Sequence, residues 1–310
     1  MSKVKVAIVQ HKAVHLDLQA TIDKTIALID EAADQGAQVT VFGETWLTGY
    51  PIWLDYCPDV ALWNNPRAKA AFTRMVKNSV AIPGDETRLL GEKAKEKGVV
   101  LCMGVNERIA SGPGNGTLYN SFIIIDASGE IVNHRRKLMP TYTERLLYGH
   151  GDGCDLNAVD TRFGRISGLI CWEHWMPLAR QALHESGEQI HVAVWPSVHE
   201  AHQIASRSYA FEGRCFVLAA GQMFQVKDIP DELWVPQHLS DDPDKWLLNG
   251  GSCVIGPDGM YIVEPVFGQE TIMTAEIDLD ACIGERMNLD VTGHYSRPDI
   301  LKLTVNRDRK

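Results

Sequence analysis

The stretch Gly168-Leu169-Ile170-Cys171-Trp172-Glu173-His174-Trp175-Met176-Pro177 places a thiol where an apolar segment gives way to a helix. Residues 166–170 form a short apolar run, which predicts a buried strand. Pro177 suits the first turn of a helix, and apolar residues follow it at helical spacing: Leu178, Ala179, Ala182 and Leu183. A sharp turn from strand to helix also exposes the nucleophilic serine of many hydrolases. We therefore predict that Cys171 lies at such a turn.

A cysteine at this position has two interpretations. At the start of a helix, backbone N–H groups and the positive end of the helix dipole favour the thiolate, which makes Cys171 a candidate nucleophile. The alternative is a small buried hydrophobic residue, the usual role of a free cysteine. The predicted turn at Cys171 is compatible with both interpretations, so further residues of the chain are needed to choose between them.

Composition sets the class of protein. The chain has 310 residues, of which 45% are apolar, so it can bury a large core, and without a composition break we expect one domain over residues 1–310. The net charge is −10 and the basic residues are scattered. Such a surface argues against nucleic-acid and anionic-membrane partners.

The cysteines and the apolar segments predict a compartment. Neither a signal-like apolar segment at the N-terminus nor an apolar run of about 20 residues occurs, so we expect a soluble, cytoplasmic protein. The seven cysteines are widely spaced and form no C-x-x-C pair, which argues against a disulfide framework and a zinc ribbon. Most of them are expected in the core.

Strand and helix patterns alternate along much of the chain, which predicts an α/β protein. Strands are expected at 4–9, 39–42, 99–105, 118–125, 130–134, 191–195, 216–220, 252–255, 260–263 and 271–277. Helices are expected at 18–33, 66–76, 85–97, 171–185 and 199–213, with Asp85 as an N-cap and Gly98 as a stop. Residues 226–246, with three prolines and several aspartates, are expected to form an exposed excursion.

Three of these segments end on side chains that can do chemistry. Val41-Phe42-Gly43 leads to Glu44, His134-Arg135-Arg136 leads to Lys137, and Ile170 leads to Cys171. Strand ends of one α/β protein converge at a sheet edge, so a carboxylate, an ammonium and a thiol can meet there. Each also has an ordinary structural interpretation: a salt-bridged glutamate, a surface lysine and a core cysteine.

These segments resemble, in this order, the motifs of the nitrilase branch of the carbon-nitrogen hydrolase superfamily, whose members carry a Glu-Lys-Cys triad. The resemblance extends over nearly the whole chain, through residues 42–51, 136–145, 151–153, 171–174, 195–197, 210–214 and 293–299. It implies a four-layer αββα sandwich. It also implies that Cys171 attacks, Glu44 transfers protons and Lys137 stabilises developing negative charge.

Glu144 matches a second glutamate that family members place beside the triad. We expect Glu144 to orient Lys137 while Glu44 serves as acid and base, and the alternative is that Glu144 merely pairs with Arg145 or solvent. The implied reaction hydrolyses a nitrile to a carboxylic acid and ammonia through a cysteine thioimidate and thioester, without a metal or an organic cofactor. The resemblance also implies self-association to dimers and larger oligomers.

Other functions remain open at this point. An amidase or carbamoylase uses the same triad, although Trp172-Glu173 after the nucleophile resembles nitrilases more closely, and a cyanide-hydrolysing enzyme is a further alternative. A catalytically silent scaffold is disfavoured because no triad position is replaced. His199-Glu200-Ala201-His202 spaces its histidines by three residues, whereas the metalloprotease motif needs four, so metal binding is not favoured.

The substrate is the least determined feature. Four aromatic residues lie in segments near the expected site and are candidates to line an apolar pocket: Tyr50, Trp53, Trp172 and Trp195. Their alternative role is the core, where most large aromatic side chains lie. The sequence leaves aromatic, arylaliphatic and aliphatic nitriles as candidates.

Overall fold

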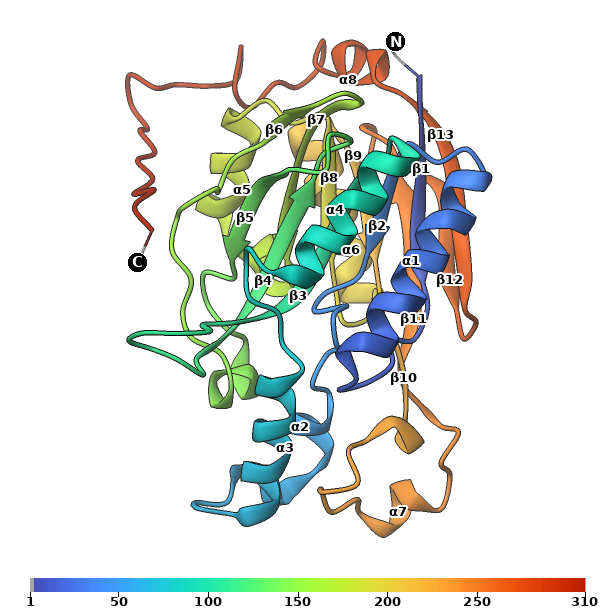
Figure 1. The fold of residues 1–310 in the computed structure, drawn as a ribbon. Coiled ribbons are helices and arrows are strands. Elements are labelled where there is room, and N and C mark those ends of the chain that lie inside the picture. The colour runs from blue at the N-terminus through green and yellow to red at the C-terminus, as the bar shows by residue number, and fades with distance from the viewer. Residues whose placement is uncertain (1–2, 310) are drawn as a thin grey trace.

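Two β-sheets pack face to face between pairs of helices in the computed structural model, which describes residues 3–309 (Figure 1). The first sheet has the order β13-β1-β2-β3-β4-β5. Its strands are β1 (Lys3–Gln10), β2 (Val39–Phe42), β3 (Val100–Arg108), β4 (Leu118–Ile125), β5 (Ile131–Arg136) and β13 (Thr271–Asp278). Strands β1, β2 and β3 are parallel, and their nearly continuous apolar sequences fit strands buried on both faces.

The second sheet has the order β10-β11-β9-β8-β7-β6, with β12 paired to β11. Its strands are β6 (Val159–Thr161), β7 (Gly164–Ile170), β8 (Ile190–Val194), β9 (Phe216–Ala220), β10 (Met223–Gln225), β11 (Trp246–Ile255) and β12 (Tyr261–Phe267). Strands β7, β8 and β9 are parallel. The chain therefore builds a parallel centre in each sheet and completes the edges with antiparallel strands.

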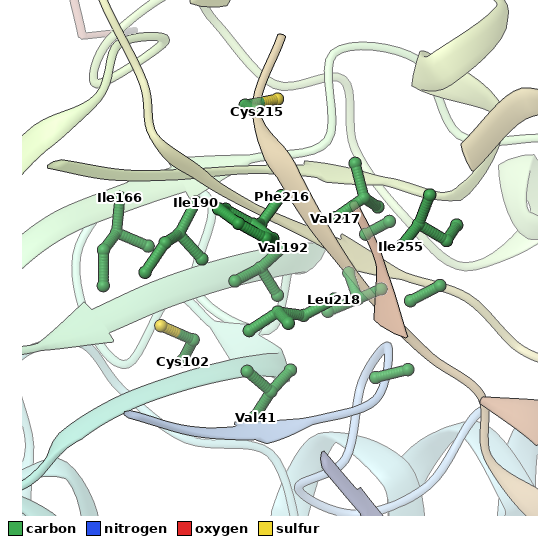
Figure 2. Close-up of a cluster of buried hydrophobic side chains, with 14 of the residues drawn as sticks. Val41, Cys102, Ile166, Ile190, Val192, Cys215, Phe216, Val217, Leu218 and Ile255 are labelled. Carbon is green, nitrogen blue, oxygen red and sulfur yellow. The ribbon is translucent and has the colours of Figure 1, made fainter. Parts of the chain in front are cut away.

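The core lies between the sheets. Figure 2 shows Val41 and Cys102 of the first sheet facing Ile190 and Val192 of the second, within one continuous buried cluster. Helices α1 (Leu18–Asp34) and α4 (Asp85–Lys97) cover the outer face of the first sheet, and α5 (Pro177–Glu185) and α6 (Glu200–Gly213) cover the second (Figure 1). This arrangement confirms the expected four-layer αββα sandwich.

Short helical segments connect the layers. They are α2 (Trp53–Tyr56), η1 (Pro58–Ala61), α3 (Pro66–Lys77), η2 (Tyr142–Leu146), η3 (Cys171–Trp175), η4 (Val226–Asp228), α7 (Gln237–Ser240) and α8 (Asp280–Glu285). The longest helix of residues 3–309 is α1, with 17 residues, and no helix in that range is long and apolar enough to cross a membrane.

The expected elements are confirmed, although several of their ends differ. The strand predicted at 252–255 already begins at Trp246, and the strand predicted at 260–263 continues to Phe267. The N-cap of α4 is Gly84, whose N–H donates to Thr87 Oγ1, so Asp85 is the first helical residue and its prediction as cap is wrong. Strand β5 continues to Arg136, two residues beyond the predicted end. The helix predicted from Cys171 is split into η3 and α5.

The segment 226–246 is not simply an exposed excursion. Its apolar side chains Val226, Ile229, Leu233 and Leu239 are buried in a second cluster that also holds Trp53. The prolines and aspartates form turns, while the apolar residues between them pack onto the segment around α2. That expectation is therefore wrong for the apolar half of the segment.

Candidate active site

Glu44, Lys137 and Cys171 follow the ends of three strands. Lys137 and Cys171 come directly after β5 and β7, and Glu44 is separated from β2 by one glycine. Strand β5 is antiparallel to β4, which is antiparallel to β3, so β5 runs in the same direction as β2. The two strands of the first sheet therefore end at the same edge, and the chain after β7 of the second sheet meets them there.

The predicted residues come together around one ammonium group. Lys137 Nζ lies 3.0 Å from Glu44 Oε1 and 2.9 and 2.8 Å from the two carboxylate oxygens of Glu144. The thiol sulfur of Cys171 and one oxygen of each carboxylate all lie within 4.8 Å of one another. All four side chains are buried, and Cys171 retains the largest exposed fraction, 3%.

The two carboxylates differ in how many of their lone pairs are used. Glu144 accepts hydrogen bonds from Lys137 on both oxygens, from the Tyr50 hydroxyl at 2.8 Å and from the Thr141 N–H at 2.9 Å. Glu44 accepts from Lys137 and Asn120 on Oε1, whereas its Oε2 is buried and has no hydrogen-bond partner among residues 3–309. Glu44 therefore has an oxygen free to take up a proton, and Glu144 does not.

A buried glutamate holds the turn that carries Cys171. Cys171 has φ +52°, the left-handed region that a residue with a side chain rarely adopts. The Glu173 carboxylate accepts from the Ile170 N–H at 2.7 Å, from the Leu138 N–H at 2.8 Å and from both terminal nitrogens of Arg135. Glu173 thus ties the chain before Cys171 to the chain on either side of Lys137.

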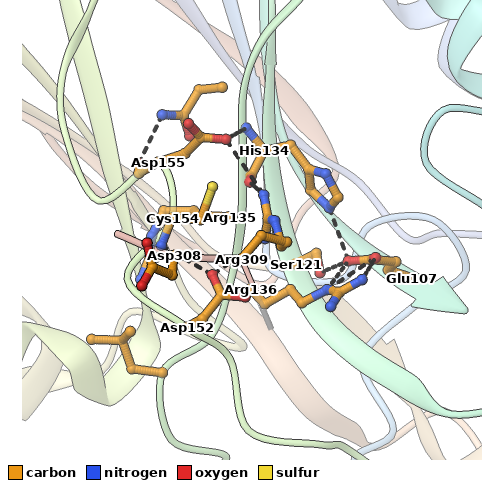
Figure 3. A network of polar contacts seen from close by, with 12 residues as sticks. Glu107, Ser121, His134, Arg135, Arg136, Asp152, Cys154, Asp155, Asp308 and Arg309 are labelled. Atoms are coloured by element: carbon orange, nitrogen blue, oxygen red, sulfur yellow. Dashed lines mark hydrogen bonds and ion pairs between the residues drawn. The ribbon is translucent and has the colours of Figure 1, made fainter. Parts of the chain in front are cut away.

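A second polar network holds the strand that ends at Lys137. Glu107 accepts from Arg136 Nε at 3.0 Å and from Ser121, and lies 2.9 Å from His134 Nε2 (Figure 3). Near the C-terminus, Arg309 donates to the carbonyl of His134 and contacts Asp155. Contacts from Glu107 and Arg309 therefore hold the backbone of β5, which leads directly to Lys137.

Burial and charge shift the proton affinity of Glu44. Its pKa is raised to about 7, chiefly because burial disfavours the carboxylate and also because Glu144 is close, while Lys137 opposes the increase. A carboxyl group with a pKa near neutrality can both accept and donate a proton under physiological conditions.

The Cys171 thiol does not follow the expectation from the sequence. Burial and the Glu44 carboxylate raise its pKa well above the ordinary value, and Lys137 only partly opposes them. The predicted stabilisation of a resting thiolate is therefore wrong, because Cys171 begins the five-residue η3 rather than a long α-helix and lies beside two carboxylates. Burial lowers the pKa of Lys137, but the surrounding acidic groups outweigh burial and raise it, so the ammonium keeps its charge.

The four predicted pocket residues lie in different surroundings. Tyr50 reaches the site through its hydrogen bond to Glu144. Trp53 is buried and donates to His15, and Trp195 is buried against Ser206 and stacks on His174. Trp172 is 52% exposed. The structure brings Tyr50 into contact with the acidic groups and places Trp53 and Trp195 in packed surroundings.

The acidic cluster also has the spacing of a cation site. Among residues 3–309, the single group of side chains close enough to hold a metal ion is Glu44, Glu144 and Cys171. Lys137 donates to both carboxylates of this group, so an internal ammonium already offsets part of their negative charge. In the zinc-like segment, His202 Nδ1 accepts from the His199 N–H at 3.2 Å and caps the start of α6.

Two residues of the site were not predicted. Asn120, the third residue of β4, donates to Glu44 at 2.6 Å, and Glu173 organises the turn that carries Cys171. A lone amide at a buried strand position was a usable signal for Asn120. The partner of Glu173, Arg135, lies 38 residues earlier, and no local pattern links them.

Comparisons with known proteins agree with this geometry. The carbon-nitrogen hydrolase family model matches residues 5–286. The chain is 38% identical to an aliphatic nitrilase of Sinorhizobium fredii (strain HH103), covering 100% of this chain and 98% of the relative, and 37% identical to an arylacetonitrilase of Aspergillus niger, covering 100% and 90%. The solved carbon-nitrogen hydrolase of Helicobacter pylori G27 has the same fold, with a TM-score of 0.73, 19% identity, and coverage of 97% and 99%. The chain belongs to the carbon-nitrogen hydrolase family.

Proposed function

We propose that the protein is a nitrilase that hydrolyses a nitrile to a carboxylic acid and ammonia, with Cys171 as nucleophile. The relatives that align over its full length are named nitrilases, one aliphatic and one acting on arylacetonitriles. The observation that carries the proposal is the buried group in which Lys137 bonds to two carboxylates within reach of the Cys171 thiol. This group provides a nucleophile, a base and a fixed positive charge.

The first step uses the unpartnered oxygen of Glu44. Because the resting thiol is neutral, Glu44 accepts its proton as the sulfur bonds to the nitrile carbon. The carbon–nitrogen triple bond becomes a double bond, and the nitrogen takes the proton from Glu44 to give a neutral thioimidate. Lys137 stabilises the negative charge that develops on nitrogen during the attack.

Two molecules of water complete the reaction. Glu44 deprotonates the first water as it adds to the thioimidate carbon, and the resulting tetrahedral intermediate expels ammonia to leave a thioester. The second water cleaves the thioester to the carboxylic acid and returns the thiol. If the tetrahedral intermediate expels the thiol instead, an amide is released, so we expect some amide as a by-product.

Product analysis separates this function from its nearest alternatives. We expect ammonia and acid from at least one member of a panel of aliphatic, arylaliphatic and aromatic nitriles, and loss of both products in Cys171→Ala. Matching amides and N-carbamoyl compounds test the amidase and carbamoylase alternatives, and cyanide tests the third. Turnover of the amides alone would replace the nitrilase proposal.

We also propose that the protein self-associates through the outer faces of η3, α5 and α6, the helices that cover the second sheet. Large apolar side chains are exposed on η3, α5 and α6 and beside them: Trp172, Trp175, Met176, Leu178, Ile204 and Phe211. An ion pair between Arg180 and Glu212 joins the two helices. A second copy of this chain would remove this apolar surface from water.

Sedimentation velocity tests this interface. We expect Leu178→Glu combined with Ile204→Glu to shift the protein toward a smaller species, while Ile283→Glu, at an equally exposed apolar position on α8, leaves the sedimentation coefficient unchanged. An unchanged assembly in the double variant would place the interface elsewhere. A monomer in the parent protein would remove self-association from the proposal.

A cytoplasmic location is the last part of the proposal. All seven cysteines are free thiols, and six of them are buried. Free thiols of this number fit a reducing compartment better than an oxidising one.

A further inference from the structure

A chain of buried polar side chains leads from the backbone of the nucleophile to a buried carboxylate. It starts at the backbone carbonyl of Cys171 and passes through His174 of η3, His191 of β8 and Glu188 in the loop before β8. Each of these side chains is at least 99% buried. The hydrolytic steps derived above use none of them.

Three contacts connect the members of this chain. His174 Nδ1 lies 2.7 Å from the carbonyl oxygen of Cys171. His174 Nε2 lies 3.0 Å from His191 Nε2, and His191 Nδ1 lies 2.9 Å from Glu188 Oε2. All three distances are those of hydrogen bonds, and each hydrogen bond needs one proton between its two atoms.

The supply of protons falls short of this number. The carbonyl of Cys171 cannot donate, so the first contact requires a proton on His174 Nδ1. Two neutral imidazoles and an ionised carboxylate carry two ring protons in total, whereas the three contacts require three. With two protons, either the Nε2 lone pairs of the histidines face each other at 3.0 Å or one of the other two contacts loses its hydrogen. The Ser167 hydroxyl lies 3.2 Å from His191 Nδ1, but its closer contact is to Glu188, so its hydrogen does not make up the deficit.

The surroundings of Glu188 decide where the third proton resides. Its carboxylate also accepts from Tyr209 Oη at 2.5 Å, from Ser167 Oγ, and lies 2.9 Å from His184 Nδ1. Two hydroxyl donors and two imidazole nitrogens around one carboxylate favour its ionised form. We propose that the third proton is shared by His174 and His191, and that this buried, Glu188-compensated imidazolium pair is a positioning device that fixes the carbonyl of Cys171.

Other groups around the pair limit its charge to one proton. Burial lowers the pKa of both histidines, and at His191 the Glu188 carboxylate opposes this lowering without reversing it. Arg135, although paired with Glu173, disfavours positive charge on either ring, so the pair holds no more than one added proton. Burial lowers the proton affinity of each ring taken by itself. The 3.0 Å contact between the rings instead disfavours the state in which neither Nε2 atom carries a proton.

Aromatic rings flank the pair, with His174 stacked on Trp195 and His191 on Tyr209.

The consequence concerns the geometry of the nucleophile. Cys171 holds a left-handed backbone conformation, and the His174 Nδ1–H bond to its carbonyl is one of the contacts that maintain it. Loss of this bond allows the elbow to relax and moves the sulfur away from the position in which it meets Glu44. A displacement of about 1 Å at a reacting atom can cost about 10²-fold in rate.

Nitrogen-15 NMR of histidine-labelled protein tests the proton count without any substrate. At neutral pH we expect His174 Nδ1 to be protonated and one strongly deshielded proton to couple to an Nε2 of the His174–His191 pair. In Glu188→Gln, which keeps the shape but removes the compensating charge, we expect this proton to be lost. Two neutral rings with unprotonated Nε2 atoms in the parent protein would overturn the proposal.

Kinetics of His174 variants test the positioning role, and this part rests on the proposed hydrolase function. Asparagine can replace the Nδ1–H donor, whereas glutamine places its amide near the Nε2 position. We expect His174→Gln to lower kcat by about 10²-fold with little change in KM, and His174→Asn to recover most of the loss. Equal losses in the two variants would contradict the positioning role.

Tyr209→Phe is the matched control, because it removes one hydrogen bond from Glu188 and keeps the ring that stacks on His191. Because Ser167 and the two imidazoles still surround Glu188, we expect Tyr209→Phe to lower the urea midpoint and to lower kcat per folded active site much less than His174→Gln does. If no nitrile is turned over by the parent protein, the proposed function fails, while the NMR experiment still tests the shared proton.

Discussion

Glu44 and Glu144 share one lysine but have different roles at the scale of single residues. Glu44→Gln removes the group that accepts the thiol proton, so we expect kcat to fall by about 10² to 10⁴-fold, the usual contribution of an acid–base group. Glu144→Gln keeps one acceptor oxygen but loses the second acceptor and its negative charge beside Lys137; because Glu44 can still take the thiol proton, we expect a smaller fall. Initial rates of ammonia release measure both, and parent-like activity in Glu144→Gln would remove that residue from the mechanism.

The pKa of Glu44 predicts the acidic limb of the pH profile. Its pKa is raised to about 7, so the carboxylate that accepts the Cys171 proton is lost as the pH falls through neutrality. We therefore expect kcat/KM to decrease below about pH 7 with a slope of one proton. The slope is read from kcat/KM between pH 5 and pH 9, buffers being matched in ionic strength. A flat profile across neutrality would mean that a different group takes the proton.

At the scale of elements, a close approach of two backbones sets the position of Glu44. A Cβ atom added to Gly104 of β3 would lie 2.4 Å from the Thr45 nitrogen and 2.7 Å from Glu44 Cα. We expect Gly104→Ala to displace the segment after β2, to lower kcat by more than about tenfold and to destabilise the fold by about 1–3 kcal/mol.

Gly284→Ala provides the comparison for this prediction, because a Cβ atom there meets no atom within 4 Å. We expect that variant to keep parent-like kcat and an unchanged or higher urea midpoint. Equal effects of the two substitutions would show that the contact between β3 and the Glu44 segment does not position the site.

The sequence was most informative about the strands and helices themselves. Apolar runs and their capping residues predicted most strands and helices, and the strand ends carried Glu44, Lys137 and Cys171. The missing information concerned contacts between distant segments. Asn120 beneath Glu44, Arg135 beside Glu173 and the burial of 226–246 depend on which elements pack together, and no local pattern specifies that.

At the scale of the whole molecule, a buried ion pair joins the two sheets beside their apolar core. Arg135 belongs to β5 of the first sheet, and Glu173 follows β7 of the second. Removing one member of a buried pair leaves the other charge without a partner, so we expect Glu173→Gln to lower the free energy of unfolding by about 3–5 kcal/mol. Urea denaturation followed by tryptophan fluorescence measures the loss.

Glu92→Gln is the control for this substitution, since it removes an exposed partner of Arg88 on α4. We expect its urea midpoint to match that of the parent. If Glu173→Gln also matched the parent, the pair would not hold the sheets together.

The central claim is that Cys171 forms a covalent intermediate with the substrate, and mass spectrometry of the intact chain tests it most directly. After brief exposure to a nitrile that is turned over, followed by acid quenching, we expect a mass increase that maps to the peptide containing Cys171. In Cys171→Ala we expect neither the mass increase nor acid formation. Continued acid production by Cys171→Ala, or an adduct on a different residue, would contradict the account.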